Sequence, residues 1–239
     1  MKKTIFLLFI LLGSYLISPA QDERKIAFQK GTMLLYDFVQ NDNTFPLTIT
    51  IESITPDFVI SFKLDGPKKK SGKVTILKKA FQKSMNLEFD FDQPKMKLDY
   101  ATFIVLSQVF FGKLDSLNDL VANSQIEQAD SARLFVSLKK GEKPVILGKV
   151  SKEIEDIAVN SKDTKLYTYI FQHYLDDHGK EVDFGSSYIF RVARNAEFPF
   201  LTYANMVTYY IAIKEVKNAQ WLIYNYSINE YERVNELIE

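Results

Sequence analysis

The stretch "LLYDFVQNDNTFPLTITIESITPDFVISFKL" (residues 34–64) repeats one pattern three times, with an apolar side chain at every second position. A period of two is typical of half-buried strands, because successive side chains of an extended chain point to opposite faces of a sheet. The alternating positions are Leu34, Tyr36 and Phe38, then Leu47, Ile49 and Ile51, then Phe58, Ile60, Phe62 and Leu64. The pattern predicts consecutive strands at hairpin spacing.

The same alternation continues along the chain. In residues 87–92 apolar and acidic side chains alternate strictly, which predicts a strand with one apolar and one acidic face. The further runs are Leu134, Val136 and Leu138; Tyr188, Phe190 and Val192; Val207, Tyr209, Ile211 and Ile213; and Leu222, Tyr224 and Tyr226. About ten to twelve such strands predict a mainly β fold, α+β at most. We expect an antiparallel twisted sheet, a sandwich or a half-barrel, with one or two short helices.

Helical signals are fewer. Ser116 and Asp119 have the spacing of a capping box. Ser151 is placed to cap a short helix that carries Ile154, Ile157 and Ala158. The run "ATFIVLSQVFFGKL" (101–114) predicts a buried strand in its first half and a helical turn after Ser107.

The first twenty residues have the order of a secretory signal peptide. Lys2 and Lys3 precede an apolar run at residues 5–12, and Ser18-Pro19-Ala20 offers small residues for cleavage before Gln21. No later segment reaches eighteen apolar residues, so we expect no transmembrane segment after cleavage. We expect residues 1–20 to be the signal peptide and 21–239 to form a single β-rich domain, with a soft division at 115–132.

Charge and cysteine content narrow the function classes. The chain has 30 basic and 30 acidic residues, and losing Lys2 and Lys3 leaves 28 against 30. This balance lacks the excess of basic residues that is typical of nucleic-acid-binding proteins. The absence of cysteine excludes thiol catalysis and zinc–thiolate sites. "LISPAQ" resembles the end of a bacterial lipoprotein signal, but Gln21 stands where the acylated cysteine would be. We expect a periplasmic or secreted protein of a Gram-negative bacterium, not a lipoprotein.

Both histidines lie in "FQHYLDDHGKE" (171–181), together with three carboxylates. We interpret this stretch as a tight hairpin with His178 at its tip. His173 then lies about 16 Å away along the strand, too far to share one metal ion with His178. No glycine-rich phosphate loop and no nucleophilic-serine motif occurs. We therefore assign no catalytic, metal or cofactor residues and expect no cofactor.

The one basic run, "PKKKSGK" (67–73), contains turn residues and lies between two predicted strands. It favours a solvated hairpin loop over an anion-binding patch, because no aromatic residues interleave with the lysines.

Tyrosines gather in the second half of the chain, with ten of the 13 from Tyr167 onward. A tyrosine or tryptophan combines an apolar body with a polar tip, which suits sugar stacking or an amphiphile pocket. Tyr203, Tyr209 and Trp221 are the candidate ligand contacts, and the alternative is that such rings fill the β core. Ser116 and Ser131 resemble the Asp-Ser-apolar acceptors of a bacterial O-glycosylation system for exported proteins.

Residues 186–216, "SSYIFRVARNAEFPFLTYANMVTYYIAIKEV", resemble exported bacterial proteins of unknown function that build twisted or half-barrel sheets. We expect a non-enzymatic exported protein that binds an envelope protein or a small apolar or glycan ligand. One alternative is a carboxylate-dependent hydrolase acting on glycans, which needs two facing carboxylates. Another is a carrier of an apolar, lipid-like ligand in a half-barrel pocket, which the resemblance implies only by analogy of fold.

Overall fold

A computed structural model describes residues 23–115, 134–137, 145–147, 154–160, 164–172, 174–175, 189–206, 208–224 and 233–237. Within these residues the chain forms eighteen strands and two short helices, which confirms the mainly β prediction. The strands outnumber the predicted ten to twelve, and six of them are only two to four residues long. In the part of the chain that is described, no helix is long and apolar enough to cross a membrane.

The largest sheet has ten strands in the order β11-β12-β14-β15-β16-β2-β3-β4-β5-β7. Its neighbours are antiparallel except for β5 and β7, and β11 and β7 are its two edges, so the sheet is open. Its strands are β11 (Ile154–Val159), β12 (Thr164–Gln172), β14 (Ile189–Ala193), β15 (Leu201–Met206), β16 (Tyr209–Lys217), β2 (Met33–Gln40), β3 (Asn43–Ser53), β4 (Phe58–Asp65), β5 (Lys69–Ile76) and β7 (Lys95–Leu98).

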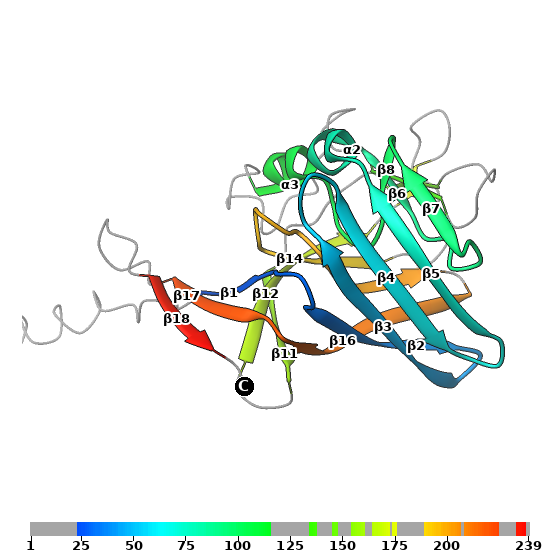
Figure 1. The fold of residues 1–239 in the computed structure, drawn as a ribbon, viewed down its shortest axis with the longest axis horizontal. Coiled ribbons are helices and arrows are strands. Elements are labelled where there is room, and N and C mark those ends of the chain that lie inside the picture. Colours follow the sequence, from blue (N-terminus) through cyan, green and yellow to red (C-terminus); the bar gives the residue numbers. More distant parts are fainter. Residues whose placement is uncertain are drawn as a thin grey trace, which may run out of the picture.

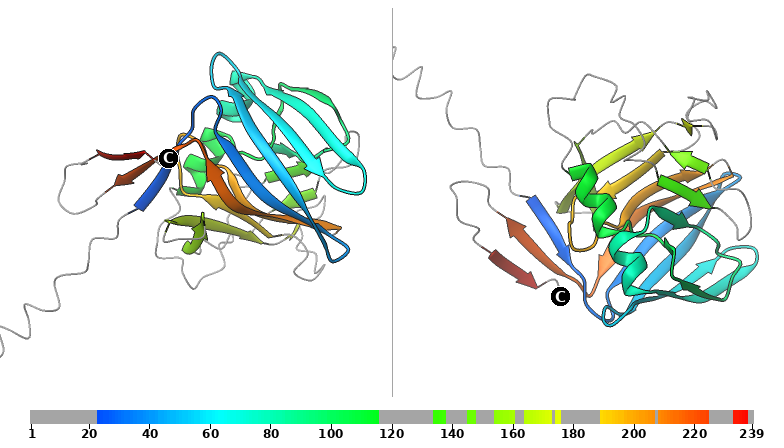
Figure 2. Two further views of the ribbon diagram at one scale, coloured as in Figure 1. Left: turned by 60° about the horizontal axis from the view of Figure 1, so that its bottom comes forward. Right: turned by 90° about the horizontal axis from the view of Figure 1, so that it is seen from above.

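Two smaller sheets accompany it (Figures 1 and 2). The five-stranded sheet has the order β13-β10-β9-β6-β8, and the three-stranded sheet β1-β17-β18 projects away from the rest. Their strands are β13 (Tyr174–Leu175), β10 (Val145–Leu147), β9 (Leu134–Ser137), β6 (Asn86–Glu88), β8 (Ala101–Thr102), β1 (Glu23–Ala27), β17 (Gln220–Tyr224) and β18 (Arg233–Leu237). In Figure 1, β6 and β8 lie with the two helices above strands β2–β5.

The stretch 34–64 forms β2, β3 and β4 as predicted, and its alternating apolar residues are all buried. A two-residue turn joins β2 to β3, and both of its residues, Asn41 and Asp42, have positive φ angles of 49° and 60°. Two such residues match the twist of a hairpin, and Asn and Asp tolerate this conformation better than most side chains. The buried Tyr36 hydroxyl donates a 2.7 Å hydrogen bond to the Leu201 carbonyl, which ties β2 to β15.

The helices follow the prediction in part. Helix α3 (Gln108–Asp115) begins after Ser107, whose Oγ accepts a 3.1 Å hydrogen bond from the Phe110 N–H, so Ser107 is its N-cap. The predicted strand before it is reduced to β8, followed by bends. Helix α2 (Lys78–Lys83) was not predicted. Residues 116–119 lie outside the described residues.

The prediction of a helix after Ser151 is wrong, because residues 154–159 form strand β11. Six residues of β11 pair with β12 in antiparallel register, from Ile154 opposite Tyr169 to Val159 opposite Thr164. Spacing at helical intervals over a few residues is a weak signal, and pairing with a distant strand overrides it.

The prediction of a strand at 87–92 with one apolar and one acidic face is also wrong. Strand β6 ends at Glu88, and the chain turns at Phe91 and Asp92. Glu88 and Asp90 are each only 3% exposed, so the supposed acidic face is largely buried. The aromatic residues of this segment enter the core, and the two acids are carried inside with them.

Aromatic rings fill the core between the ten-stranded sheet and the segment that covers it. Phe91 packs edge-on against both Phe62 and Phe103, at centroid distances of 5.5 and 5.3 Å. The ring centroids of Phe89 and Phe190 are 6.0 Å apart. Phe190 belongs to β14, which lies near the other end of the ten-stranded sheet from β4, the strand of Phe62. These contacts fix residues 86–103 against the inner face of the sheet.

Gly72 gives a test of this packing. A Cβ atom at Gly72 would lie 2.5 Å from Cε1 of Phe62 and 2.9 Å from the Gln93 carbonyl oxygen. Gly72→Ala should therefore displace the Phe62 ring and lower the free energy of unfolding by about 1–3 kcal/mol. Urea denaturation measures the loss. Ser71→Ala, one residue along on the exposed face, is the control, and equal stability of the two variants would contradict the packing argument.

Candidate ligand-binding surface

Two tyrosines and an arginine meet on the outer face of the ten-stranded sheet, opposite the core. Arg191 on β14 is in register with Tyr203 on β15, and Tyr210 on β16 is in register with Asn205. Their chain neighbours Phe190, Ala204 and Ile211 are fully buried on the inner face. Strand alternation therefore places Arg191, Tyr203 and Tyr210 together on the outer side, and we call this cluster the tyrosine platform.

The rings of the tyrosine platform lie close together. The Tyr203 and Tyr210 centroids are 5.7 Å apart, with 32° between the ring planes. The Arg191 guanidinium carbon lies 5.0 Å from the Tyr203 ring centroid, in a cation–π arrangement. Partial burial raises the pKa of Tyr203, and the charge of Arg191 opposes this shift. Tyr210 is 36% exposed, which leaves its ring accessible to a ligand.

Polar groups border the platform. The Lys214 ammonium lies 3.6 Å from an Asp37 carboxylate oxygen, and Asp37 is in register with Ala212 on the same face. Asn205 is half-buried in the strand beside Tyr210. The surface thus combines aromatic ring faces with amide, carboxylate and ammonium groups, and it can stack on an apolar face while bonding polar substituents.

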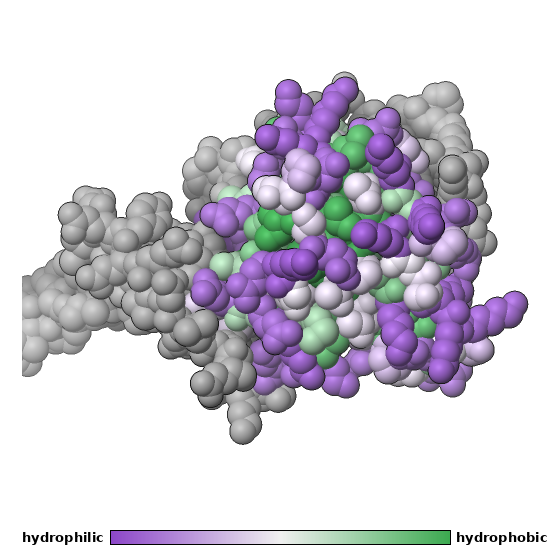
Figure 3. Space-filling view, in the orientation of Figure 1, coloured by the Kyte–Doolittle hydropathy of each residue, from purple (hydrophilic) through white to green (hydrophobic). Residues whose placement is uncertain are grey.

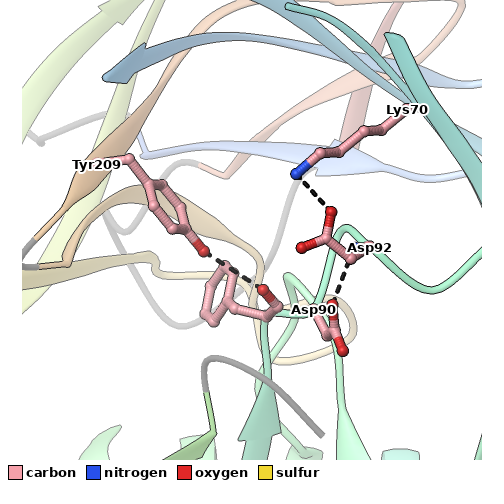
Figure 4. A network of polar contacts seen from close by, with 5 residues as sticks. Lys70, Asp90, Asp92 and Tyr209 are labelled. Atoms are coloured by element: carbon pink, nitrogen blue, oxygen red, sulfur yellow. Dashed lines mark hydrogen bonds and ion pairs between the residues drawn. The ribbon is translucent and has the colours of Figure 1, made fainter. Parts of the chain in front are cut away.

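Tyr209 does not belong to this surface, although it is adjacent in sequence to Tyr210. Its ring points to the inner face and stacks on Phe38 at 4.7 Å. Its hydroxyl donates a 3.3 Å hydrogen bond to the Phe89 carbonyl, as Figure 4 shows. Tyr209 therefore joins β16 to the segment that covers the core.

Trp221, the third candidate contact, is 1% exposed and lies in β17 opposite Ile26. Its indole nitrogen has no hydrogen-bond partner among the described residues. The structure thus brings neither Trp221 nor Tyr209 to the tyrosine platform. Tyr210 and Arg191, which the sequence did not single out, join Tyr203 there instead. Strict alternation with the buried Ile211 is the signal that could have revealed Tyr210.

The acids near the core hold structural contacts. Figure 4 shows Lys70 beside Asp92, with 2.6 Å between their charged atoms, and Asp90 accepting a 2.9 Å hydrogen bond from the Asp92 N–H. Glu88 accepts a 2.9 Å hydrogen bond from the Tyr100 hydroxyl. Among the described residues, no cluster of three potential ligands could hold a metal ion.

Four further predicted positions lie outside the described residues. They are His173 and His178, which we assigned to a hairpin, and the possible O-glycosylation sites Ser116 and Ser131.

Comparisons of the chain with protein-family models, curated proteins and solved structures found no match. The resemblance of residues 186–216 to half-barrel proteins therefore brings no named relative, and only the geometry of the surface bears on function.

Tyr100 offers a pH test of the contact with Glu88. Desolvation, together with the hydrogen bond and the charge of Glu88, raises the pKa of Tyr100 to about 12. The folded state thus holds the Tyr100 proton more strongly than the unfolded state does. The protonated Tyr100 hydroxyl therefore stabilises the fold below pH 10.0, the ordinary pKa, and this stabilisation is lost as the pH rises towards 12. Glu88→Gln should lower the Tyr100 midpoint in an NMR titration with labelled tyrosine. An unchanged midpoint would contradict the role of Glu88.

Proposed function

We propose that this chain is an exported binding protein that recognises an oligosaccharide through the tyrosine platform. The observation that carries the proposal is the close pair of rings, Tyr203 and Tyr210, on an outer sheet face that has polar groups around it. The apolar C–H face of a sugar ring stacks on an aromatic ring, while its hydroxyls bond to neighbouring polar groups.

The arrangement of the cluster favours ligand binding over catalysis. Arg191 stacks on Tyr203 and limits the motion of that ring, so little freedom is lost when a ligand binds. The ring of Tyr210 is the more accessible of the two, so it is the proposed point of contact. A ring exposed on the face of a sheet fits an extended glycan better than a small enclosed molecule.

The alternative functions gain less support. Glu88 and Asp90 are the two buried acids of the described core, and both hold internal hydrogen bonds, which disfavours them as a facing hydrolytic pair. For the apolar carrier, the described inner face of the sheet is occupied by rings such as Phe62, Phe103 and Phe190, which favours a packed core over a pocket.

Export is part of the proposal and has its own test. We expect cleavage after Ala20 when the chain is produced in a Gram-negative host, because small residues precede that bond. Mass spectrometry of the periplasmic fraction should find an N-terminal peptide beginning at Gln21. Recovery of only the intact Met1 form in the cytoplasm would contradict export.

The binding surface is tested at Tyr210. A panel of maltoheptaose, cellohexaose and chitohexaose, measured by isothermal titration calorimetry, should contain a ligand for the wild-type protein. Tyr210→Ala should weaken that binding about fivefold, because one stacked ring contact is lost. Tyr210→Phe keeps the ring and should bind within about twofold of wild type.

Val109→Ala is the matched control for removal of an exposed apolar side chain, because Val109 is 45% exposed on α3. Its affinity should equal that of wild type. Equal affinity of Tyr210→Ala and wild type, or binding of none of the three sugars, would reject the platform as their site.

A further inference from the structure

We propose that lysines of β4, β5 and β7 form a second surface, which binds the anionic surface of a lipid bilayer. The lysine face consists of five residues that are all exposed on the outer side of the sheet: Lys63, Lys69, Lys73, Lys95 and Lys97. The proposal goes beyond oligosaccharide recognition and does not depend on the tyrosine platform.

Strand register brings these lysines together. Lys73 of β5 is in register with Lys95 of β7, and Lys63 of β4 is in register with Ser71 of β5. Their neighbours Val74 and Met96 are buried on the inner face, so the ammonium groups extend from the opposite side. With strands about 4.8 Å apart and about 6.7 Å between alternate residues, the lysines cover a compact area on three strands.

The local charge differs from that of the whole chain. Residues 63–97 contain ten lysines and four acids, whereas the chain as a whole has 30 basic and 30 acidic residues. Two of the four acids, Glu88 and Asp90, are buried. The other two, Asp65 and Asp92, pair with Lys63 and Lys70 at 2.9 and 2.6 Å. The described acids of this segment therefore leave the lysine face with a positive charge.

The arrangement has a cost within the fold. Like charges that face each other on adjacent strands are destabilising, and Lys73 and Lys95 are such a pair. Within the described residues, no carboxylate forms an ion pair with Lys69, Lys73, Lys95 or Lys97. An external anionic surface would relieve this repulsion.

The chemistry of the face favours lipid headgroups over nucleic acid. None of the described large apolar side chains that are exposed, Tyr100, Val109 and Tyr210, belongs to the lysine face, so it offers no ring on which bases could stack. The β4–β5 hairpin end, at the lower right of Figure 3, is mostly hydrophilic. Lysines spread over three strands match a planar array of phosphates, and each contributes about fivefold in affinity near such a surface.

Vesicle co-sedimentation tests the proposal with the full chain. The probes are vesicles of phosphatidylcholine alone and vesicles with one quarter phosphatidylglycerol. The readout is the ratio of the two partition coefficients, and each variant is compared with wild type because Lys2, Lys3 and the apolar segment at residues 5–12 contribute equally to all of them. The wild-type ratio should be high at 50 mM salt and fall towards one at 500 mM.

The variant Lys73→Gln/Lys95→Gln should lower this ratio about 25-fold. Lys214→Gln/Lys217→Gln removes the same charge from β16, where both lysines have acidic partners, and should keep the wild-type ratio. The first variant should melt no lower than wild type, because it removes a repulsion.

Three results would overturn the proposal. They are a wild-type ratio near one at 50 mM salt, equal ratios for the two variants, and binding to soluble dextran sulfate without a preference for phosphatidylglycerol, which would assign the face to a soluble polyanion.

Discussion

The packing of the Phe62 ring over Gly72 and against Phe91 and Phe103 is the constraint on which the remaining structure depends. A sheet that buries one face needs a second layer, and residues 86–111 supply it. Phe62 reaches that layer because its cross-strand partner has no side chain in its way. The chain must then turn sharply after β6 to insert Phe89 and Phe91, which brings Glu88 and Asp90 inside with them.

The closed inner face directs both proposed functions to the outer one. On each strand, the residues that alternate with the core residues face away from the core. Side chains at these positions can therefore contact a ligand. The platform around Tyr203 and Tyr210 occupies β14–β16, and the lysine face occupies β4, β5 and β7. Strands β2 and β3 lie between them in the sheet order, so the two surfaces can act at the same time.

Local alternation was enough to predict β2, β3 and β4, because each has one buried face and its pattern depends only on that burial. It failed at residues 87–92, where Glu88 and Asp90 are buried and Glu88 accepts a hydrogen bond from Tyr100, twelve residues further along the chain. Alternation with Ile211 puts Tyr209 and Tyr210 on opposite faces, but it could not show which side chains each of them meets. Those contacts depend on the register of β16 against β2 and β15, which pairs Ile211 with Phe38 and with Ala204.

The lysine run at 67–73 shows why the surfaces were harder to predict than the strands. The sequence favoured a solvated loop, and residues 66–68 do form the turn between β4 and β5. The lysines that follow belong to a strand, and their neighbours on β7 come from a parallel pairing more than twenty residues away. The net charge of the whole chain is zero, so it does not reveal the cluster of lysines on β4, β5 and β7. A surface formed by long-range register becomes visible only when the strand order is known, and both proposed sites are of this kind.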